Sequence, residues 1–147
     1  MLNITGTALV LWLHVLAACI WIGGQVTIAI LIPILRGEGQ LARITGRRYQ
    51  TIAWPAFGVL VVTGIINVGN TGIAWRHLLD TDPGRTLAVK LGLVAVSGLA
   101  AGVHAFLQAP RRDAAIVGRP WAAALLGSVS LLAAVLAALY GVAIANV

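Results

Sequence analysis

A stretch of 29 residues, Thr7–Leu35, contains no charged side chain. An α-helix of roughly 20 apolar residues crosses a hydrocarbon core about 30 Å thick, so this stretch predicts a membrane span. His14 lies inside it. An ionisable side chain within a span is costly unless it faces the interior of the protein. His14 is therefore a candidate functional residue.

The rest of the chain is equally apolar. Hydrophobic residues make up 60% of the 147 residues and charged residues only 10%, whereas soluble domains carry roughly 25% charged residues. Asp82-Pro83-Gly84 is typical of a turn before the third apolar segment. The pattern predicts an all-α membrane protein, a four-transmembrane-helix bundle forming one domain over residues 1–147. The four predicted helices cover about residues 7–35, 51–69, 86–108 and 121–144.

The basic residues predict the orientation. The first and third connections hold seven arginines: Arg36, Arg43, Arg47, Arg48, Arg111, Arg112 and Arg119. The second connection holds only Arg76 and Arg85, with Asp80 and Asp82 beside them. Because cytoplasmic connections carry the excess of Lys and Arg, we expect both termini and the His77 loop to lie outside. The net charge of +6 then reports topology rather than a nucleic acid partner.

Polar side chains recur at helical spacing on three of the predicted helices. The three stripes are His14, Trp21 and Gln25; Thr63, Asn67 and Asn70; and Lys90, Ser97 and His104. Residues at these spacings share a helix face, and facing lipid would leave their polar groups unsatisfied. We expect the stripes to face the bundle interior.

Depth separates these residues further. At 1.5 Å per residue, His14 and Lys90 each lie roughly 10 Å to the outer side of their helix centres. Asn67 and Tyr140 reach the same outer half, whereas His104 lies on the inner side. The sequence therefore predicts a polar site in the outer half, with His104 roughly 20 Å from His14 along the membrane normal.

Each of these residues also has a structural explanation. Lys90 can snorkel to the headgroups, and Tyr140 can anchor at the interface, as tryptophans do. Asn67 can hydrogen-bond between helices, and His104 can bond a backbone carbonyl. His14 is the hardest of them to explain by structure alone.

Imidazole is a ligand for copper, zinc and haem iron, so His14, His77 and His104 are the candidate metal or haem ligands. His14 with His77 would form an outer metal site if the loop folds back over the bundle. Soft ligands for Cu(I) are scarce, because Cys19 is the only cysteine and Met1 the only methionine. A haem b with His14 as axial ligand is the alternative, with His77 or a dimer partner as second ligand. The depth of His104 argues against a haem bridged by His14 and His104.

Three segments resemble the CopD copper-resistance membrane domain. They are the LHxxAxxxWxGG pattern of Leu13–Gly24, the pair Arg47-Arg48-Tyr49 and Val61–Asn67, and the GRxLxxKL pattern of Gly84–Leu91. The resemblance implies a multi-pass protein of the bacterial inner membrane, linked to copper uptake or tolerance. It also implies that His14, Trp21, Asn67 and Lys90 are the candidate functional residues. The four-helix plan also looks like the HemJ-type protoporphyrinogen oxidases, which are associated with haem b.

Three functions follow as hypotheses. The first is a CopD-like protein that binds or transports copper in the outer half, with Asn67 and Lys90 orienting ligands. The second is a haem-binding redox protein or electron-transfer subunit, and the third is a structural subunit of a membrane complex. No Walker, Rossmann, Ser-His-Asp or HExxH pattern occurs, so transport or binding is favoured over catalysis; an enzyme would be a haem-dependent oxidoreductase. Expected partners are the lipid bilayer and a metal ion or haem, with a homodimer or larger complex left open.

Overall fold

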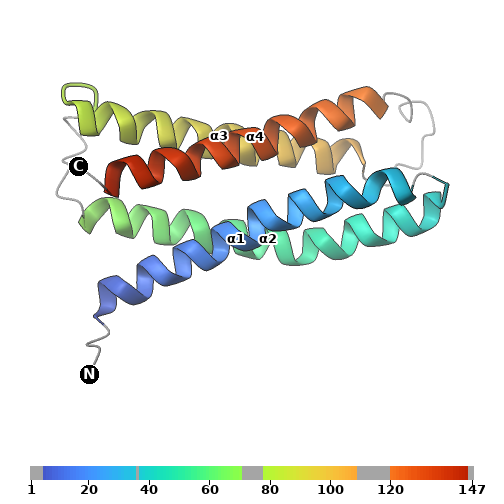
Figure 1. Ribbon diagram of the computed structural model, residues 1–147, viewed down its shortest axis with the longest axis horizontal. Coiled ribbons are helices and arrows are strands. Elements are labelled where there is room, and N and C mark those ends of the chain that lie inside the picture. The colour runs from blue at the N-terminus through green and yellow to red at the C-terminus, as the bar shows by residue number, and fades with distance from the viewer. Residues whose placement is uncertain (1–4, 36, 71–77, 109–119, 146–147) are drawn as a thin grey trace. The chain divides into compact units, whose positions relative to one another are not determined.

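The computed structural model describes residues 5–35, 37–70, 78–108 and 120–145. These residues form four helices and no strand: α1 (Gly6–Leu35), α2 (Gly39–Asn70), α3 (Asp82–Leu107) and α4 (Pro120–Ala145) (Figure 1). All four are long and apolar enough to cross a membrane. The structure confirms the all-α class and the four predicted spans of a multi-pass membrane protein.

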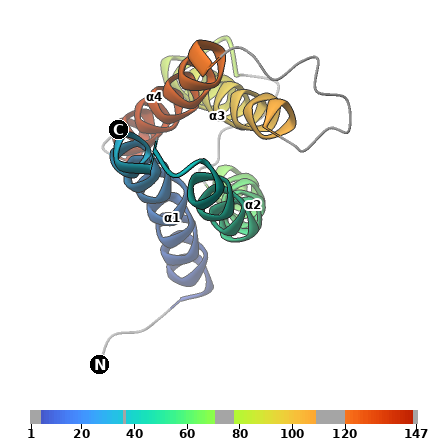
Figure 2. The ribbon, with the colours of Figure 1, turned by 90° about the vertical axis from the view of Figure 1, so that its right-hand side faces the viewer.

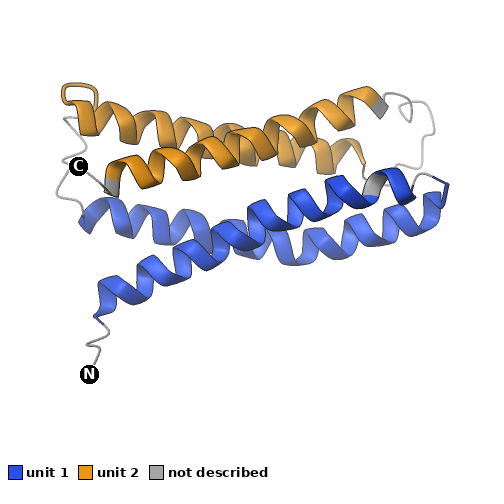
Figure 3. Ribbon diagram, in the orientation of Figure 1, with its two compact units in different colours: residues 1–74 blue, residues 75–147 orange. Residues whose placement is uncertain are grey.

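The chain divides into two compact units, Met1–Ala74 and Trp75–Val147 (Figure 3). In the first unit α1 lies beside α2, and in the second α3 lies beside α4 (Figure 2). We call these antiparallel pairs hairpin 1 (α1 and α2) and hairpin 2 (α3 and α4). The single domain over residues 1–147 stays a prediction.

Helix α2 begins at Gly39, twelve residues before the predicted start at residue 51. The extra turns carry Arg43, Arg47 and Arg48, so hydropathy did not mark them as part of the helix. The chain turns tightly into α2, since the Glu38 N–H donates to the Leu35 carbonyl at 2.9 Å and the Glu38 carbonyl accepts from Ala42 at 3.0 Å. With 32 residues, α2 is about 48 Å long.

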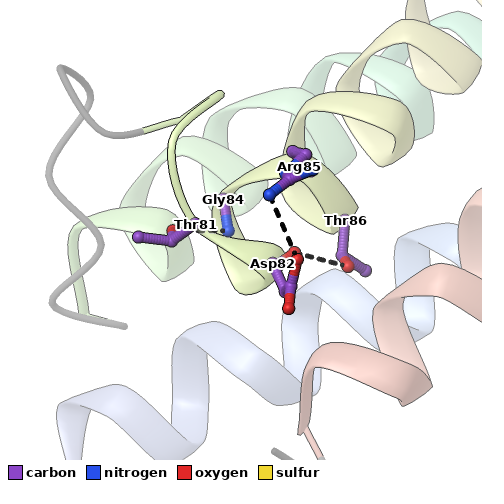
Figure 4. A network of polar contacts seen from close by, with 5 residues as sticks. All are labelled: Thr81, Asp82, Gly84, Arg85 and Thr86. Carbon is purple, nitrogen blue, oxygen red and sulfur yellow. Dashed lines mark hydrogen bonds and ion pairs between the residues drawn. The ribbon is translucent and has the colours of Figure 1, made fainter.

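Helix α3 begins at Asp82, so the prediction that Asp82–Gly84 forms a turn outside the helix was wrong. Thr81 caps the helix, and its Oγ1 accepts the Gly84 N–H at 3.2 Å. Proline is well tolerated in a first helical turn, where its missing N–H costs no hydrogen bond. Asp82 adds an ion pair with Arg85 at 3.3 Å, and its carbonyl accepts the Thr86 hydroxyl at 2.9 Å (Figure 4).

Large apolar side chains cover the hairpins. Ile30, Leu99 and Leu132 are 65%, 70% and 62% exposed, as expected for surfaces that meet a lipid bilayer. Alanine is the commonest residue at the buried positions, which also hold Trp21, Leu60, Val68, Leu87, Thr63, Ser97 and Ser130. Among the described residues, every buried side-chain nitrogen or oxygen has a hydrogen-bond partner. Small residues thus bring the paired helices close, and their few polar atoms are satisfied inside the pairs.

Candidate functional site

His14 lies on α1 and is held by α2. Its Nδ1 is 3.0 Å from the Thr63 hydroxyl oxygen. Thr63 is only 6% exposed, and its hydroxyl donates to the Val59 carbonyl at 2.6 Å, one turn earlier on α2. The Leu60 carbonyl lies farther away, at 3.3 Å. A half-buried imidazole is therefore fixed to a buried hydroxyl inside an apolar hairpin.

A glycine provides the space for this imidazole. A Cβ on residue 64 would lie 3.3 Å from His14 Cε1, closer than side chains ordinarily approach. Gly58, one and a half turns earlier on the same helix, has nothing within 4 Å of the equivalent position. Gly64 thus lets the ring of His14 lie directly against the backbone of α2.

The middle of hairpin 1 is filled by aromatic rings. Trp21 is 3% exposed, and its ring centroid lies 4.5 Å from that of Phe57 and 5.9 Å from that of Trp54. The Trp54 and Phe57 rings meet edge to face at 6.0 Å. Trp21, which the sequence places in a polar stripe, contributes its indole ring to this aromatic cluster.

The Trp21 carbonyl makes the polar contacts at this level. It accepts the Gln25 amide at 3.1 Å from its own helix and the Tyr49 hydroxyl at 3.2 Å from α2. The Tyr49 ring lies against Gly24, where a Cβ would overlap it. Gln25 thus bonds within α1, whereas Tyr49 links α2 to the same carbonyl.

Hairpin 2 is joined at its centre by two serines. The Ser97 hydroxyl donates to the Ser130 carbonyl at 2.9 Å, and the Ser130 hydroxyl donates to the Ser97 carbonyl at 3.0 Å. Both serines are 1% exposed, and their hydroxyl oxygens are 3.3 Å apart. Each hydroxyl of this reciprocal pair thus has a hydrogen-bond acceptor on the other helix of hairpin 2.

Two long polar side chains of α3 flank the serine pair. Lys90 lies against Gly141, with Nζ 3.1 Å from the position of a Cβ on residue 141. His104 lies against Gly127, with Cε1 4.0 Å from the equivalent position. Lys90 and His104 are fourteen residues apart on α3, and the two glycines are fourteen residues apart on α4. The stripe of α3 therefore faces α4 in a continuous antiparallel register.

His104 uses both ring nitrogens in hydrogen bonds. Nδ1 lies 2.9 Å from the Ala123 carbonyl of α4, and Nε2 lies 3.3 Å from the Gln108 amide nitrogen of its own helix. A carbonyl only accepts, so Nδ1 carries the proton and Nε2 accepts from Gln108. These contacts are those of a histidine that ties two helices together.

For the other predicted residues that the structure describes, only the helix position and the degree of burial are known. Asn67 is half-buried on α2, one turn beyond Thr63, and Tyr140 is half-buried on α4, next to Gly141. His77 lies outside the described residues. Within the described part of the chain no three His, Cys, Asp or Glu side chains come together as a metal cluster. Hairpin 1 thus offers one imidazole rather than a complete ligand set.

Thr63, Tyr49 and Gly64 are the site residues that sequence reasoning did not select. Thr63 was placed on the correct stripe of its helix, but its contact with His14 depends on the register of α1 against α2. A Thr-Gly pair opposite a histidine of the preceding span is the signal that would have identified it.

Comparison with known proteins adds a family. The model of copper resistance protein D matches residues 43–146, which include two of the three resembling segments but not Leu13–Gly24. Copper transport protein CutJ of Bacillus subtilis (strain 168) is 32% identical over 110 residues, covering 71% of this chain and 20% of CutJ. The chain thus spans about a fifth of that relative, and no solved structure matches it. The chain belongs to the copper resistance protein D family of multi-pass membrane proteins.

Proposed function

We propose that this protein binds copper within the bacterial inner membrane and conducts it across, with His14 as a ligand in the outer half. Two findings support a copper function: the family match and the similarity to a protein named for copper transport. Because the family match begins at residue 43, the assignment of His14 rests on hairpin 1 itself.

The observation that carries the proposal is the hydrogen bond of His14 to Thr63 at 3.0 Å. It holds a half-buried imidazole in one orientation on a helix that has no charged side chain. Imidazole nitrogen suits copper, and histidine ligands are usually oriented by a hydrogen bond from their other nitrogen. His104 serves as the comparison, since its two nitrogens bond the Ala123 carbonyl and the Gln108 amide.

One imidazole does not complete a copper site, so further ligands belong to the proposal. His77 is the proposed second ligand, and Asn67 is proposed to orient the site. Lys90 is proposed to orient ligands or tune the charge of the site, although a cation beside copper is unfavourable. Within hairpin 2 its side chain lies against Gly141.

The test compares two histidine variants. Purified wild-type protein, His14→Ala and His104→Ala are titrated with Cu(I) against a chromophoric chelator, and copper is measured by elemental analysis. We expect His14→Ala to lose at least about tenfold in affinity, the lower end for losing an element of a metal site. His104→Ala should bind copper as the wild type does. Equal affinities in all three proteins would contradict the role of His14.

The same preparations distinguish the two other hypotheses. An axial haem ligand needs the same hydrogen-bonded imidazole, so the geometry of His14 also suits haem b. A Soret band that is present in the wild type and absent in His14→Ala would show that His14 binds haem, and would favour the haem hypothesis over copper. A protein that takes up neither copper nor haem when both are supplied would point to a structural subunit.

A further inference from the structure

We infer that Thr63 and Gly64 are positioning residues that hold His14 as its Nδ1–H tautomer and direct metal coordination to Nε2. The metal part of this inference rests on the proposed function. The tautomer part rests on hydrogen bonds within hairpin 1 and holds whichever metal or cofactor is bound.

The tautomer follows from the single hydrogen of the Thr63 hydroxyl. That hydrogen lies in the short contact to the Val59 carbonyl, at 2.6 Å between oxygens, which is a strong O–H···O distance. Toward His14, at 3.0 Å, the hydroxyl oxygen can then only accept. Nδ1 must therefore carry the imidazole hydrogen.

The opposite arrangement is unfavourable. If the hydroxyl donated to His14 Nδ1, the Thr63 and Val59 oxygens would remain 2.6 Å apart with no hydrogen between them. Thr63 is 6% exposed, so water would not relieve this repulsion. In a neutral imidazole with Nδ1 protonated, the lone pair that binds a metal lies on Nε2. Thr63 thus selects the coordinating nitrogen.

Gly64 fixes the position of the ring. His14 Cε1 lies 3.3 Å from the place of a Cβ on residue 64, and Cε1 is bonded to both ring nitrogens. A methyl group there would push the ring away by a few tenths of an ångström. Such a shift uses up a large part of the tolerance of about 0.5 Å within which metal sites hold their ligands. Adjacent residues of α2 therefore set the tautomer and the ring position separately.

The first experiment reads the tautomer directly. Protein labelled with 15N-histidine is studied by NMR without metal, at a pH where imidazole is neutral, and His14 is assigned with the His14→Asn variant. We expect the wild type to show Nδ1–H and Thr63→Ser to keep it. Thr63→Val, which replaces the hydroxyl by a methyl group, should give a mixture of tautomers. The inference would be overturned if the His14 ring hydrogen of the wild type were on Nε2, or if Thr63→Val left the tautomer unchanged.

The second experiment reads copper affinity by chelator competition. Thr63→Val should lose about 10–100-fold, the usual effect of removing a partner of a histidine ligand, and Thr63→Ser should recover most of it. Gly64→Ala should weaken copper binding while keeping the Nδ1–H tautomer, and Gly58→Ala on the same helix should match the wild type. Equal affinities for Thr63→Val and the wild type would overturn the positioning role.

The two proposals fail in distinguishable ways. If the wild type binds no copper, the proposed function is refuted. The NMR experiment still decides whether Thr63 sets the tautomer of His14. A wild type that binds copper through His14 with Nδ1 unprotonated removes only the inference. Circular dichroism of each variant shows whether the helices have formed, so a folding failure is not mistaken for a loss of ligand binding.

Discussion

The two hairpins solve the same problem with different residues. Both bring two membrane helices together by laying a large side chain on a glycine of the partner helix. Hairpin 1 does so with His14 on Gly64 and Tyr49 on Gly24, one from each helix. Hairpin 2 takes both large side chains from α3 and both glycines from α4.

The difference lies in how the polar atoms are satisfied. Ser97 and Ser130 donate to each other's carbonyls, and both nitrogens of His104 are hydrogen-bonded within hairpin 2. In hairpin 1 the chain of bonds runs in one direction, from His14 through Thr63 to the Val59 carbonyl. A reciprocal pair holds helices together, whereas a directed chain orients the group at its end. The comparison teaches that polar residues in spans need to be sorted by bonding pattern, not by their presence.

We expect the largest loss of stability when the contact between Tyr49 and Gly24 in hairpin 1 is broken. Gly24→Ala places a methyl group where the Tyr49 ring lies, and an aromatic ring cannot bend away. We expect a loss of about 1–3 kcal/mol in the free energy of unfolding, as for overpacked cores. Reversible unfolding in mixed micelles measures it.

The neighbouring Gly23→Ala is the matched control, because nothing lies within 4 Å of its added methyl group. Both variants gain the same helix propensity, so their difference reports the contact with Tyr49 alone. Equal stabilities of the two variants would show that the Tyr49–Gly24 contact does not constrain hairpin 1.

A smaller effect would sharpen the view of hairpin 2 as a closed pair. Ser97→Ala and Ser130→Ala each remove one bond to a backbone carbonyl, at an expected cost of about 0.6 kcal/mol and at most about 1.7 kcal/mol. Because each hydroxyl bonds a carbonyl that the other substitution leaves in place, the double variant should be nearly additive.

Ser128→Ala, an exposed serine of α4, is the control for this series and should leave the stability unchanged. A strongly non-additive double variant would mean that the hydroxyl–hydroxyl contact at 3.3 Å, not the two carbonyl bonds, dominates the pair.

The smallest effect on stability concerns Lys90, the only lysine of the chain. Gly141→Ala meets the flexible end of its side chain, at 3.1 Å from Nζ, so the side chain can move away at a cost of about 0.5 kcal/mol or less. The displaced amine should react faster with an amine-selective reagent, as measured by mass spectrometry of the labelled peptide.

Gly92→Ala, with nothing within 4 Å, provides the comparison on α3. Unchanged labelling of Lys90 in Gly141→Ala would place the amine outside the hairpin already in the wild type and remove the glycine contact from the description of hairpin 2.

The number of helices and the all-α class are predicted correctly, because each follows from apolar segments long enough to cross a membrane as a helix. It misplaces the start of α2, since residues 39–50 form a helix with arginines that hydropathy does not recognise. It also misplaces the start of α3, because Thr81 and Pro83 form a helix cap rather than a separate turn.

The candidate site is predicted only in part. Periodicity placed His14 and Thr63 each on a polar face of its own helix, but no pattern within one helix states which residue of the next helix lies opposite. That pairing is decided by where glycines allow close approach, as at Gly64. The aromatic packing of Trp21 shows the same limit: a stripe identifies a face, not its neighbour.

The fourteen-residue spacing shared by α3 and α4 has a mechanical consequence. Gly141 and Gly127 receive Lys90 and His104 at two points about 21 Å apart along the helix axis. A slide of α3 along α4, or a rotation of α3, would move both long side chains off their glycines at once. A change of register inside hairpin 2 therefore disturbs two contacts rather than one. We expect the two helices to keep their register when hairpin 2 moves.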